Sequence, residues 1–596
     1  MRSRLFAMLA AALVLAGSAA GQSVDPFVPP AGAEAARVAP APPLRLADDP
    51  GAAPIARLAP ATEAAADRLA ALHAWNASGR LPQRIGIHRE LPLVEPIAVL
   101  GERRADAAAL PGRAARTPAG TAVWGGEVRV ADAARLRLHL TDLDLPPGTR
   151  MWVWGSEEGP IGPFGLELAA EGGMWSPSVD GPAIRLEIEV PAGAARAVFR
   201  IDRVAEILAG GAPPAAGESA AAAPLVTDCL ADANCFGPAQ FPAIELVRKA
   251  VAHLQFDSGE PGFVDVCSGA LLNDVGSTGT PFLLTAHHCF SSQAKAATLE
   301  AFWDYTTIAC GAGPTSLGTR PRSNGSTVLA TGVASDFTLV RLGSVPGGRA
   351  FLGWTANPSD VTPGATLHRV HHPVPETTIF PQSYTAQRFL GAAFGQQCQG
   401  TNDPSQFHHG ELVDGGTFGG SSGAPLMLGN GQVVGQLLGA CGPNPTEGCD
   451  AANEEIDGAF SASFPSLAPF LAPSEGDDSP CVPGLGTICL NNGRHEVEIT
   501  FLTPQGAFGQ GGVAPAGSVN SGIFYFFNPN NWEMLIKILN GCPVNGRWWI
   551  FFAATTNVQF TVTVRDTLTG TTKSYFNPLG QAAEPVQDTA AFATCP

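Results

Sequence analysis

Residues 281–290 read PFLLTAHHCF, an apolar run that ends in two histidines, a cysteine and a phenylalanine. The apolar run is typical of a buried β-strand, and a rigid strand fixes the direction of a side chain at its end. A catalytic base could therefore stand here, at His287 or at His288. A histidine considered alone is more often a hydrogen-bonded loop residue, so the rest of the chain has to decide between the two interpretations.

Two other stretches could work with such a base. The segment GGTFGGSSGAPLM (415–427) surrounds Ser421 and Ser422 with glycines, which let the backbone turn several N–H groups into one concavity suited to a negative oxygen. The segment ASDFTLVRL (334–342) places Asp336 directly before an alternating, strand-like run. Taken separately, the first segment is typical of a flexible turn, and the aspartate is typical of a cap or a solvated turn residue at the start of a strand.

Together the three stretches occur in the order His, Asp, Ser, and they resemble the chymotrypsin clan of serine endopeptidases. TAHHC is similar to the histidine motif of the clan, DFTLVRL to its aspartate motif and GGSSGAP to its nucleophile loop. Within the clan the chain resembles bacterial lysyl endopeptidases, which also carry SDFTL, an HHP segment (371–373 here) and GSSG-x-P. The similarity covers about residues 227–472.

This resemblance implies an all-β fold with a chymotrypsin-like double β-barrel, and peptide-bond hydrolysis through an acyl-enzyme. The base would be His288, the histidine directly before the cysteine, with His287 only its neighbour. Asp336 would orient that base, and Ser422 would be the nucleophile. The backbone N–H groups of Gly420 and Ser422 would form the oxyanion hole. Neither a metal ion nor an organic cofactor is expected.

The cysteines fit a secreted protein. The chain has 12 cysteines, in even numbers within 229–449 and within 481–595, which favours disulfides that stay inside domains. The resemblance implies that Cys267 bonds to Cys289 and holds two strands beneath the base. The other implied pairs are Cys235 with Cys310, Cys229 with Cys441 or Cys449, and a last pair that includes Cys398.

The chain departs from the clan where activation and specificity are set. Ser421 stands where many animal trypsin-like enzymes have the aspartate that pairs with a new N-terminal amine, so that ion pair is not available here. Gly416 stands where trypsin has its pocket acid. In lysyl endopeptidases this acid comes from a later segment, which here reads NEEIDGAF (453–460).

Glu455 is the best match to the pocket acid, with Glu454 and Asp457 as alternatives. A desolvated carboxylate selects strongly for a cation, so we predict a basic residue before the cut bond, either lysine, which is favoured, or arginine. Leu438 stands where the resembling enzymes have a histidine near the base of the pocket, which leaves the acceptance of arginine open. The competing interpretation of Glu455 is a solvated loop carboxylate.

At 596 residues the chain is too long for one core, and its composition changes several times. Two arginines and an apolar run open the chain, Ala, Pro and Arg then dominate with one helix-like stretch (61–75), and alternating apolar runs follow. The Ala/Pro-rich composition is not expected to bury much. The predicted segments are a signal peptide (1–21), an Ala/Pro-rich pro-segment (22–91), a β-rich pro-domain (92–207), a linker (208–226), the protease domain (227–472), a second linker (473–480) and a C-terminal β-sandwich accessory domain (481–596).

These features predict a secreted or periplasmic bacterial serine endopeptidase, monomeric, that acts on proteins or peptides. Its pro-region would serve as an inhibitor or folding aid and be released by a cut in the first linker. The formal net charge of −18 without a basic stripe excludes nucleic acid as a partner, and no later run is apolar enough to span a membrane.

Two other classes of function compete with this prediction. One is a catalytically silent binding or adhesion protein that keeps the protease fold. The other is a cysteine- or metal-based hydrolase that uses the pairs His371/His372 and His408/His409, although these pairs lack the HExxH spacing. In the C-terminal domain three tryptophans could bind carbohydrate or, as the alternative, pack in the core: Trp532, Trp548 and Trp549.

Overall fold

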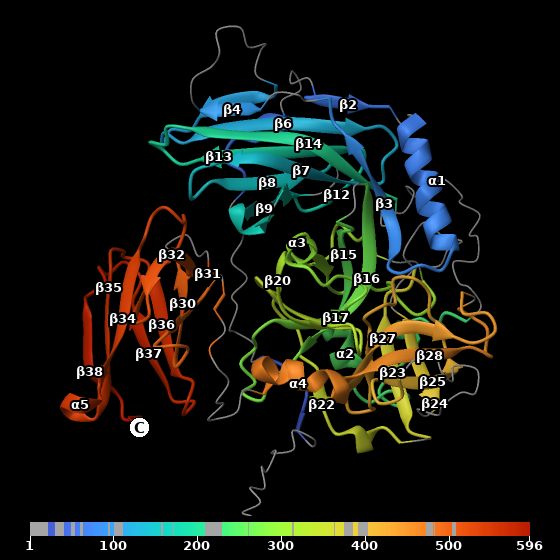
Figure 1. The fold of residues 1–596 in the computed structure, drawn as a ribbon. Coiled ribbons are helices and arrows are strands. Elements are labelled where there is room, and N and C mark those ends of the chain that lie inside the picture. Colours follow the sequence, from blue (N-terminus) through green and yellow to red (C-terminus); the bar gives the residue numbers. More distant parts are fainter. Residues whose placement is uncertain are drawn as a thin grey trace, which may run out of the picture.

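The protein is described from a computed structural model, in which strands dominate (Figure 1). The all-β expectation is confirmed. The predicted signal peptide, the second linker and nearly all of the first linker lie outside the described residues. The structure describes residues 22–29, 41–48, 54–59, 63–92, 96–100, 111–156, 159–170, 172–208, 229–259, 262–312, 315–362, 364–374, 385–390, 403–446, 448–472, 481, 483–484, 486–503 and 508–595, with 385–390, 414 and 508 described by their backbone alone.

Two sheets pack face to face in the N-terminal part of the molecule (Figure 1). Successive side chains of a strand point to opposite faces of its sheet, so every second residue faces the core between the two sheets. Leu136, Leu138 and Leu140 are buried in this core together with Trp124 and Phe199. The first sheet contains β2 (Ala56–Leu58), β6 (Ala122–Val130), β13 (Ala183–Val190), β8 (Arg150–Trp154), β9 (Ile161–Phe164) and β5 (Arg113–Arg116). The second contains β10 (Ala169–Ala170), β11 (Gly173–Trp175), β7 (Arg135–Asp144), β14 (Ala197–Ile207), β3 (Gln83–Glu90), β4 (Ile97–Leu100) and β12 (Val179–Asp180).

Strand β3 differs from the expectation for the Ala/Pro-rich segment. Seven of its eight residues are buried, because the strand lies between two neighbours, β14 and β16, and helix α1 (Glu63–Ala77) packs against it. The helix agrees with the helix-like stretch in the sequence. The expectation that this segment buries little was therefore wrong for β3, whose isoleucines Ile85 and Ile87 supply the apolar side chains.

Through β3 the second sheet continues into the part of the chain from residue 229 to 472, called the protease-like part below. Strand β15 pairs along one edge of β16, while β3 and β17 pair with the two ends of its other edge, at residues 263–266 and 270–272. PFLLTA, predicted as a strand, forms β17. The continuation contains β16 (Phe263–Leu272), β15 (Val251–Asp257), β18 (Glu300–Phe302), β19 (Arg322–Asn324), β17 (Phe282–Ala286), β21 (Phe337–Leu342) and β20 (Ser326–Gly332).

A second sheet of the protease-like part closes on itself. Strand β28 (Glu454–Ala459) pairs with both β25 and β27, which closes six of the strands, from β27 through β26, β23, β24 and β25 to β28, into a barrel. The N-terminal strand β1 (Ser23–Val24) adds to this sheet at β22 (Gly353–Thr355). Its other strands are β27 (Gln432–Cys441), β26 (Pro425–Met427), β23 (Thr366–His371), β24 (Thr385–Leu390) and β25 (Phe407–Asp414), and the helices of this part are α2 (Ile244–Ala250), α3 (Gln293–Ala296) and α4 (Phe460–Leu471).

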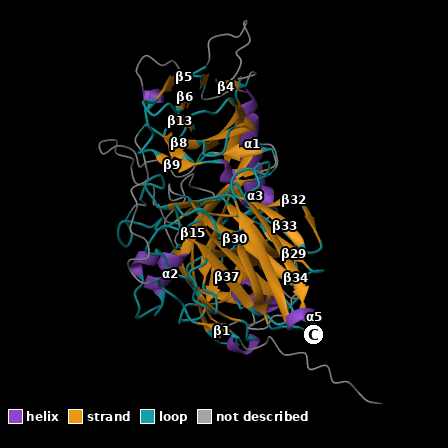
Figure 2. Ribbon diagram, turned by 90° about the vertical axis from the view of Figure 1, so that its left-hand side faces the viewer, coloured by secondary structure: helices purple, strands orange, loops and turns teal. Residues whose placement is uncertain are grey.

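The C-terminal residues form a two-sheet sandwich with its own core (Figures 1 and 2). Val497, Ile499 and Phe501 alternate into this core, as their spacing predicts. Trp548 is buried in the core, whereas Trp532 is 52% exposed. The sheets contain β29 (Thr487–Leu490), β30 (His495–Leu502), β36 (Gln559–Asp566), β37 (Thr572–Asn577) and β31 (Phe508–Gln510), and β32 (Gly512–Ser518), β33 (Ser521–Tyr525), β34 (Met534–Gly541), β35 (Arg547–Ala554) and β38 (Val586–Phe592), with α5 (Cys542–Asn545).

Among the residues that the structure describes, no helix combines the length and the apolar character needed to cross a bilayer.

Candidate active site

The structure brings His288 and Asp336 together at the ends of two paired strands. Strand β17 ends at Ala286 opposite Phe337, the first residue of β21, so the residues beyond these ends lie side by side. His288 Nδ1 is 2.7 Å from Asp336 Oδ2, and the backbone N–H of His288 donates to Asp336 Oδ1 over 2.9 Å. Both carboxylate oxygens are thus engaged by the same histidine, which fixes the direction of the imidazole ring.

The neighbouring histidine is turned elsewhere. His287 Nδ1 lies 2.8 Å from the hydroxyl of Thr331, and its backbone N–H donates to the carbonyl of Asp336 over 2.9 Å. Nε2 of His288 is buried and has no hydrogen-bond partner among the described residues. Of the two histidines in TAHHC, only His288 has a ring that a carboxylate orients, and its second nitrogen has no hydrogen-bond partner among the described residues.

Ser422 lies in a turn that only glycines can build. Gly420 and Gly423 flank it with φ angles of +90° and +77°. A Cβ atom on Gly420 would meet the carbonyl oxygen of His372 at 2.8 Å, and one on Gly423 would overlap Thr285 Oγ1. The glycines therefore serve both the left-handed backbone and the close packing of the turn.

Two backbone carbonyl groups of this turn accept hydrogen bonds from β16, whereas two of its backbone amide groups are not engaged. The backbone N–H of Ser268 donates to Ser422 O over 2.8 Å, and the hydroxyl of Ser268 donates to Gly420 O over 2.8 Å. In the described part of the chain, the N–H groups of Gly420 and Ser422 have no protein acceptor. Two such donors held in a rigid turn are suited to binding a tetrahedral oxyanion.

A neutral hydrogen bond holds Ser421, the residue before the candidate nucleophile. Ser421 is fully buried, and its Oγ lies 2.7 Å from His371 Nδ1 while accepting the backbone N–H of Phe418 over 3.3 Å. Burial, reinforced by the charge of Arg369, lowers the pKa of His371 well below its usual range, so the ring is uncharged. This contact occupies the place where animal trypsin-like enzymes are expected to have an ion pair.

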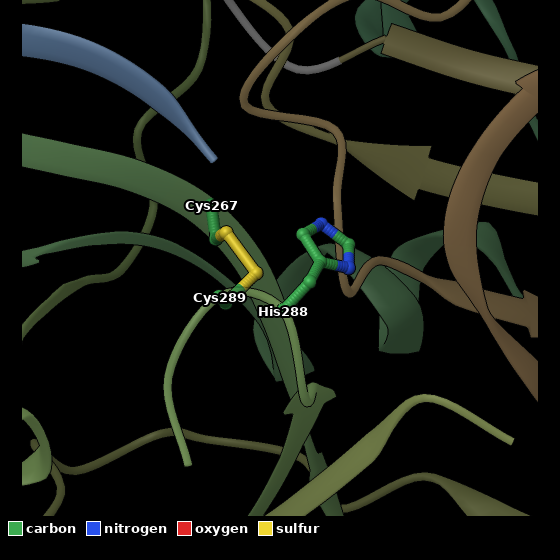
Figure 3. Close-up of side chains that lie close together, drawn as sticks. All are labelled: Cys267, His288 and Cys289. Carbon is green, nitrogen blue, oxygen red and sulfur yellow. A yellow bond between two sulfur atoms is a disulfide. The ribbon is translucent and has the colours of Figure 1, made fainter. Parts of the chain in front are cut away.

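A disulfide supports the base from below. Cys267 on β16 bonds to Cys289, the residue after His288, and the imidazole lies next to the sulfur atoms (Figure 3). Among the described residues these three form the one group of His, Cys, Asp or Glu side chains close enough together to bind a metal ion. Both sulfurs are used in the disulfide, so the group offers a single nitrogen and does not fit a metal site.

The other disulfides of the protease-like part lie where the resemblance implies them. Cys235 bonds to Cys310. The sequence left the partner of Cys229 open between Cys441 and Cys449, and the structure pairs Cys229 with Cys449. Cys441 is also disulfide-bonded. Cys398 lies outside the described residues.

Glu455 lies beneath the segment that leads to the nucleophile turn. Its side chain is buried, with 1% of the residue exposed, and Oε1 accepts the hydroxyl of Thr417 over 2.5 Å. Oε2 has no partner among the described residues. Burial raises the pKa of Glu455 to about 7, against the opposing effects of the charge of Arg369 and the Thr417 hydrogen bond.

The two alternative pocket acids are placed differently. Asp457 shares a strand face with Glu455, but its Oδ1 lies 2.6 Å from the guanidinium of Arg369 in a fully buried ion pair. Glu454 takes the opposite face of β28. Leu438 is half-buried and packs on the apolar cluster that contains Ile456.

Sequence reasoning missed the residues that distinguish these acids. Thr417 belongs to the glycine-rich stretch, but no local motif marks it as a partner of Glu455. Arg369 stands on β23, far from β28 in sequence, and pairs with Asp457 only because the barrel closes. The side chain of Gln436 likewise donates to the carbonyl of Ser335 over 2.7 Å. Ser335 directly precedes Asp336, so this hydrogen bond holds the backbone next to the acid that contacts His288. Only three-dimensional contacts reveal these roles.

The protease-like part is similar to known proteases in sequence. Residues 226–453 match the family described as lysyl endopeptidase, C-terminal domain. The chain is 26% identical over 353 residues to a lysyl endopeptidase of Pseudomonas aeruginosa, which covers 57% of this chain and 72% of that protein. The resemblance inferred from the motifs is therefore confirmed.

Two solved structures are also similar. A protease of M. tuberculosis in its active form covers 42% of this chain and 92% of its own, with 16% identity and a TM-score of 0.26. An inactivated protease paralogue of the scabies mite covers 38% of this chain and 96% of its own, with 12% identity and a TM-score of 0.25. At these TM-scores neither structure adds an argument, and it is the sequence comparisons that support a protease of the lysyl endopeptidase-like kind.

Proposed function

We propose that the protein is a secreted serine endopeptidase that hydrolyses peptide bonds after basic residues. The observation that carries the proposal is the bond of 2.7 Å between His288 Nδ1 and Asp336 Oδ2, at a histidine whose Nε2 has no partner among the described residues. The glycine turn around Ser422 further supports the proposal, because Ser422 would be the nucleophile and the two unengaged amide groups would bind the oxyanion.

The proposed mechanism proceeds in two halves. Ser422 Oγ attacks the carbonyl carbon of the substrate while His288 accepts the hydroxyl proton at Nε2. Asp336 stabilises the imidazolium, and the N–H groups of Gly420 and Ser422 bind the oxyanion. Collapse of the tetrahedral intermediate transfers the proton to the leaving amine and leaves an acyl-enzyme. Water, activated by the same histidine, then releases the acid and restores the serine.

The proposed specificity rests on Glu455. A carboxylate oxygen that is buried without a partner is costly, and the ammonium of a lysyl side chain, or the guanidinium of an arginyl one, would supply the missing donor. Asp457 is a weaker candidate because Arg369 already neutralises it. A basic preference would thus come from one carboxylate that the fold keeps available.

The compartment and the processing belong to the same proposal. The disulfides of the protease-like part and of the C-terminal sandwich favour an oxidising, extracellular or periplasmic setting. A cut between about residues 208 and 227 would break the chain between the N-terminal strands and the protease-like part, although β3 would still pair with β16. The protein would then be a zymogen of an enzyme that acts on proteins or peptides.

Replacement of the nucleophile tests the proposal. Ser422→Ala should lower turnover of a lysyl peptide amide by about 10⁴-fold or more and abolish labelling by a fluorophosphonate probe, with the thermal unfolding midpoint unchanged. His288→Ala should be comparably inactive. His287→Ala is the matched control, because its ring contacts Thr331, and it should retain the chemistry. Substantial turnover by Ser422→Ala would reject the assignment.

A further inference from the structure

A segment from the N-terminal part of the chain crosses the candidate active site. The side chain of Gln83 lies directly against Gly419, next to the turn that carries Ser422: a Cβ atom built on Gly419 would overlap the amide group of Gln83 and would lie 2.7 Å from Gln83 Cβ. On the other side of the site, Leu81 Cδ1 would lie 3.6 Å from a Cβ atom on Gly439 of β27. Residues 81–83 therefore span the distance between β27 and the turn that carries Ser422.

The segment continues as a strand added to the edge of β16. Gln83 pairs with Val266, and Arg84 with Asp265, in an antiparallel register. Val266 directly precedes Cys267, whose disulfide lies beside the ring of His288, and the strand from the N-terminal part runs next to it in Figure 3. An extended peptide seated by main-chain pairing beside the reactive groups is the way a peptide substrate adds to a sheet edge.

The end of helix α1 fastens this segment. Trp75 Nε1 donates to the carbonyl of Pro82 over 2.9 Å. The side chain of Asn76 donates to Arg84 O over 2.8 Å and accepts the backbone N–H of Arg84 over 2.9 Å. Both sides of the segment are thus engaged, one by β16 and the other by the helix.

The segment presents no cation to the site. Its two basic side chains are held by aromatic rings: the guanidinium of Arg80 lies 5.2 Å from the ring centre of Trp75, and that of Arg84 lies 3.7 Å from Trp75 and 3.9 Å from Phe263. The residues that cross the site between them are Leu81, Pro82 and Gln83. None of these three side chains carries a positive charge, so none of them would pair with Glu455 in a pocket that binds a basic side chain.

We infer that residues 80–84 are an inhibitory strand seated in the substrate cleft of the same chain and fastened there by Trp75 and Asn76. This inference rests on the proposed function, because it identifies what fills that cleft before maturation. The strand excludes substrate by occupying the edge of β16, and it escapes cleavage because its arginines are bound outside the pocket.

Amide hydrogen exchange tests the seat of the strand without relying on activity. The full chain with Ser422→Ala is compared with the same chain carrying Trp75→Ala and Asn76→Ala, and Asp67→Asn on the exposed side of α1 is the matched control. The peptide that covers residues 263–266 should exchange at least about tenfold faster in the Trp75/Asn76 variant and at the parental rate in the control. Equal protection in all three chains would overturn the inference.

Labelling of the chains that retain Ser422 connects the seat to inhibition. The Trp75/Asn76 variant should react with a fluorophosphonate at least about tenfold faster than the unaltered full chain. Equal rates in the two chains would overturn inhibition, although the proposed enzyme would stand. Loss of protection at residues 263–266 with no labelling of any chain would instead reject the proposed function and leave the strand in its place.

A second variant covers the case in which the Trp75/Asn76 variant fails to fold. Leu81→Lys combined with Pro82→Ala places a lysine beside Gly439 and an ordinary secondary amide after it. The chain should then cut itself after residue 81, as mass spectrometry would detect, and the same chain with Ser422→Ala should stay intact. A chain that reacts with the fluorophosphonate but is never cut at this position would contradict the seat of the strand in the cleft.

Discussion

Two buried carboxylates, one in each sheet of the protease-like part, are treated in opposite ways by the fold. Asp336 stands at the entry of β21, and both of its oxygens are satisfied by His288. Glu455 stands within β28, and one of its oxygens is left without a partner among the described residues. The satisfied carboxylate is suited to holding another group in place, whereas the unsatisfied one is suited to receiving a ligand.

Removing the charge of Asp336 should have the largest effect. In Asp336→Asn the imidazole loses the acceptor at Nδ1, so the wrong tautomer is stabilised and kcat should fall by about 10⁴-fold. The ratio of kcat/KM for lysyl and leucyl peptides should stay constant, since the pocket is untouched. Asp403→Asn, at an exposed position, is the control and should leave both values unchanged. A change in this ratio would contradict the separation of roles, in which Asp336 orients the base and Glu455 selects the substrate.

Removing the charge of Glu455 should act on selection alone. Glu455→Gln should lower kcat/KM for lysyl and arginyl peptides by about 10²-fold, because an ammonium or guanidinium would enter the pocket without its partner. Leucyl peptides should be cleaved at the parental rate. If lysyl and arginyl rates stay unchanged relative to the leucyl rate, Glu455 does not select the substrate, and Glu454→Gln and Asp457→Asn become the next variants to measure.

The raised pKa of Glu455 predicts how selection depends on pH. Because this pKa is about 7, the lysyl to leucyl ratio of kcat/KM should rise about tenfold per pH unit below 7 and level off above it. Taking the ratio cancels the pH dependence that the base imposes on both substrates.

The same raised pKa makes the free energy of unfolding depend on pH in the opposite direction. The fold favours the protonated carboxyl of Glu455, so the contribution of this group to stability is full below pH 4.5 and is lost as the pH rises through 7. Glu455→Gln should therefore raise the unfolding midpoint at pH 8.

Loss of the Thr417 hydroxyl should have the smallest effect. Thr417→Val removes the hydrogen bond that favours the charged form of Glu455, so the lysyl to leucyl ratio should fall about threefold to tenfold and its pH profile should move to higher pH. Thr417→Ser keeps the hydroxyl and should behave like the parent chain. An unshifted pH profile in the valine variant would show that the Thr417 hydrogen bond does not affect the pKa of Glu455.

The sequence marks the candidate groups of the site by local motifs, but it does not mark their surroundings. His288, Asp336 and Ser422 each lie in a short motif whose strand or turn forms from local residues, so those elements could be read directly. Which of the three acids of β28 is available depends on Arg369, which comes from β23, and on Thr417, which comes from the loop between β25 and β26. Such contacts are set by register between distant segments and leave no local pattern.

The N-terminal inhibitory strand was missed for a related reason. Its partner strand is about 180 residues away, and the Ala/Pro-rich surroundings are typical of a segment that buries little. The arginines reinforce that impression, although Arg84 is buried against the faces of Trp75 and Phe263. Composition describes a segment by itself, whereas burial here is supplied by the neighbours that it finds.

The bridge between Cys229 and Cys449 has a consequence for the unfolded chain. It joins residues 220 apart and closes a ring that contains almost the whole protease-like part. In the loop-entropy account a ring of this size removes about 5 kcal/mol of conformational freedom from the denatured ensemble, roughly twice the effect of the eight-residue ring at Cys481–Cys489. Because Cys229 lies just after the first linker, the new end created by a cut between residues 208 and 227 would remain covalently anchored within about 20 residues. The loop beside Glu455 would thus be restrained before and after maturation, with no need for a freed amine to dock.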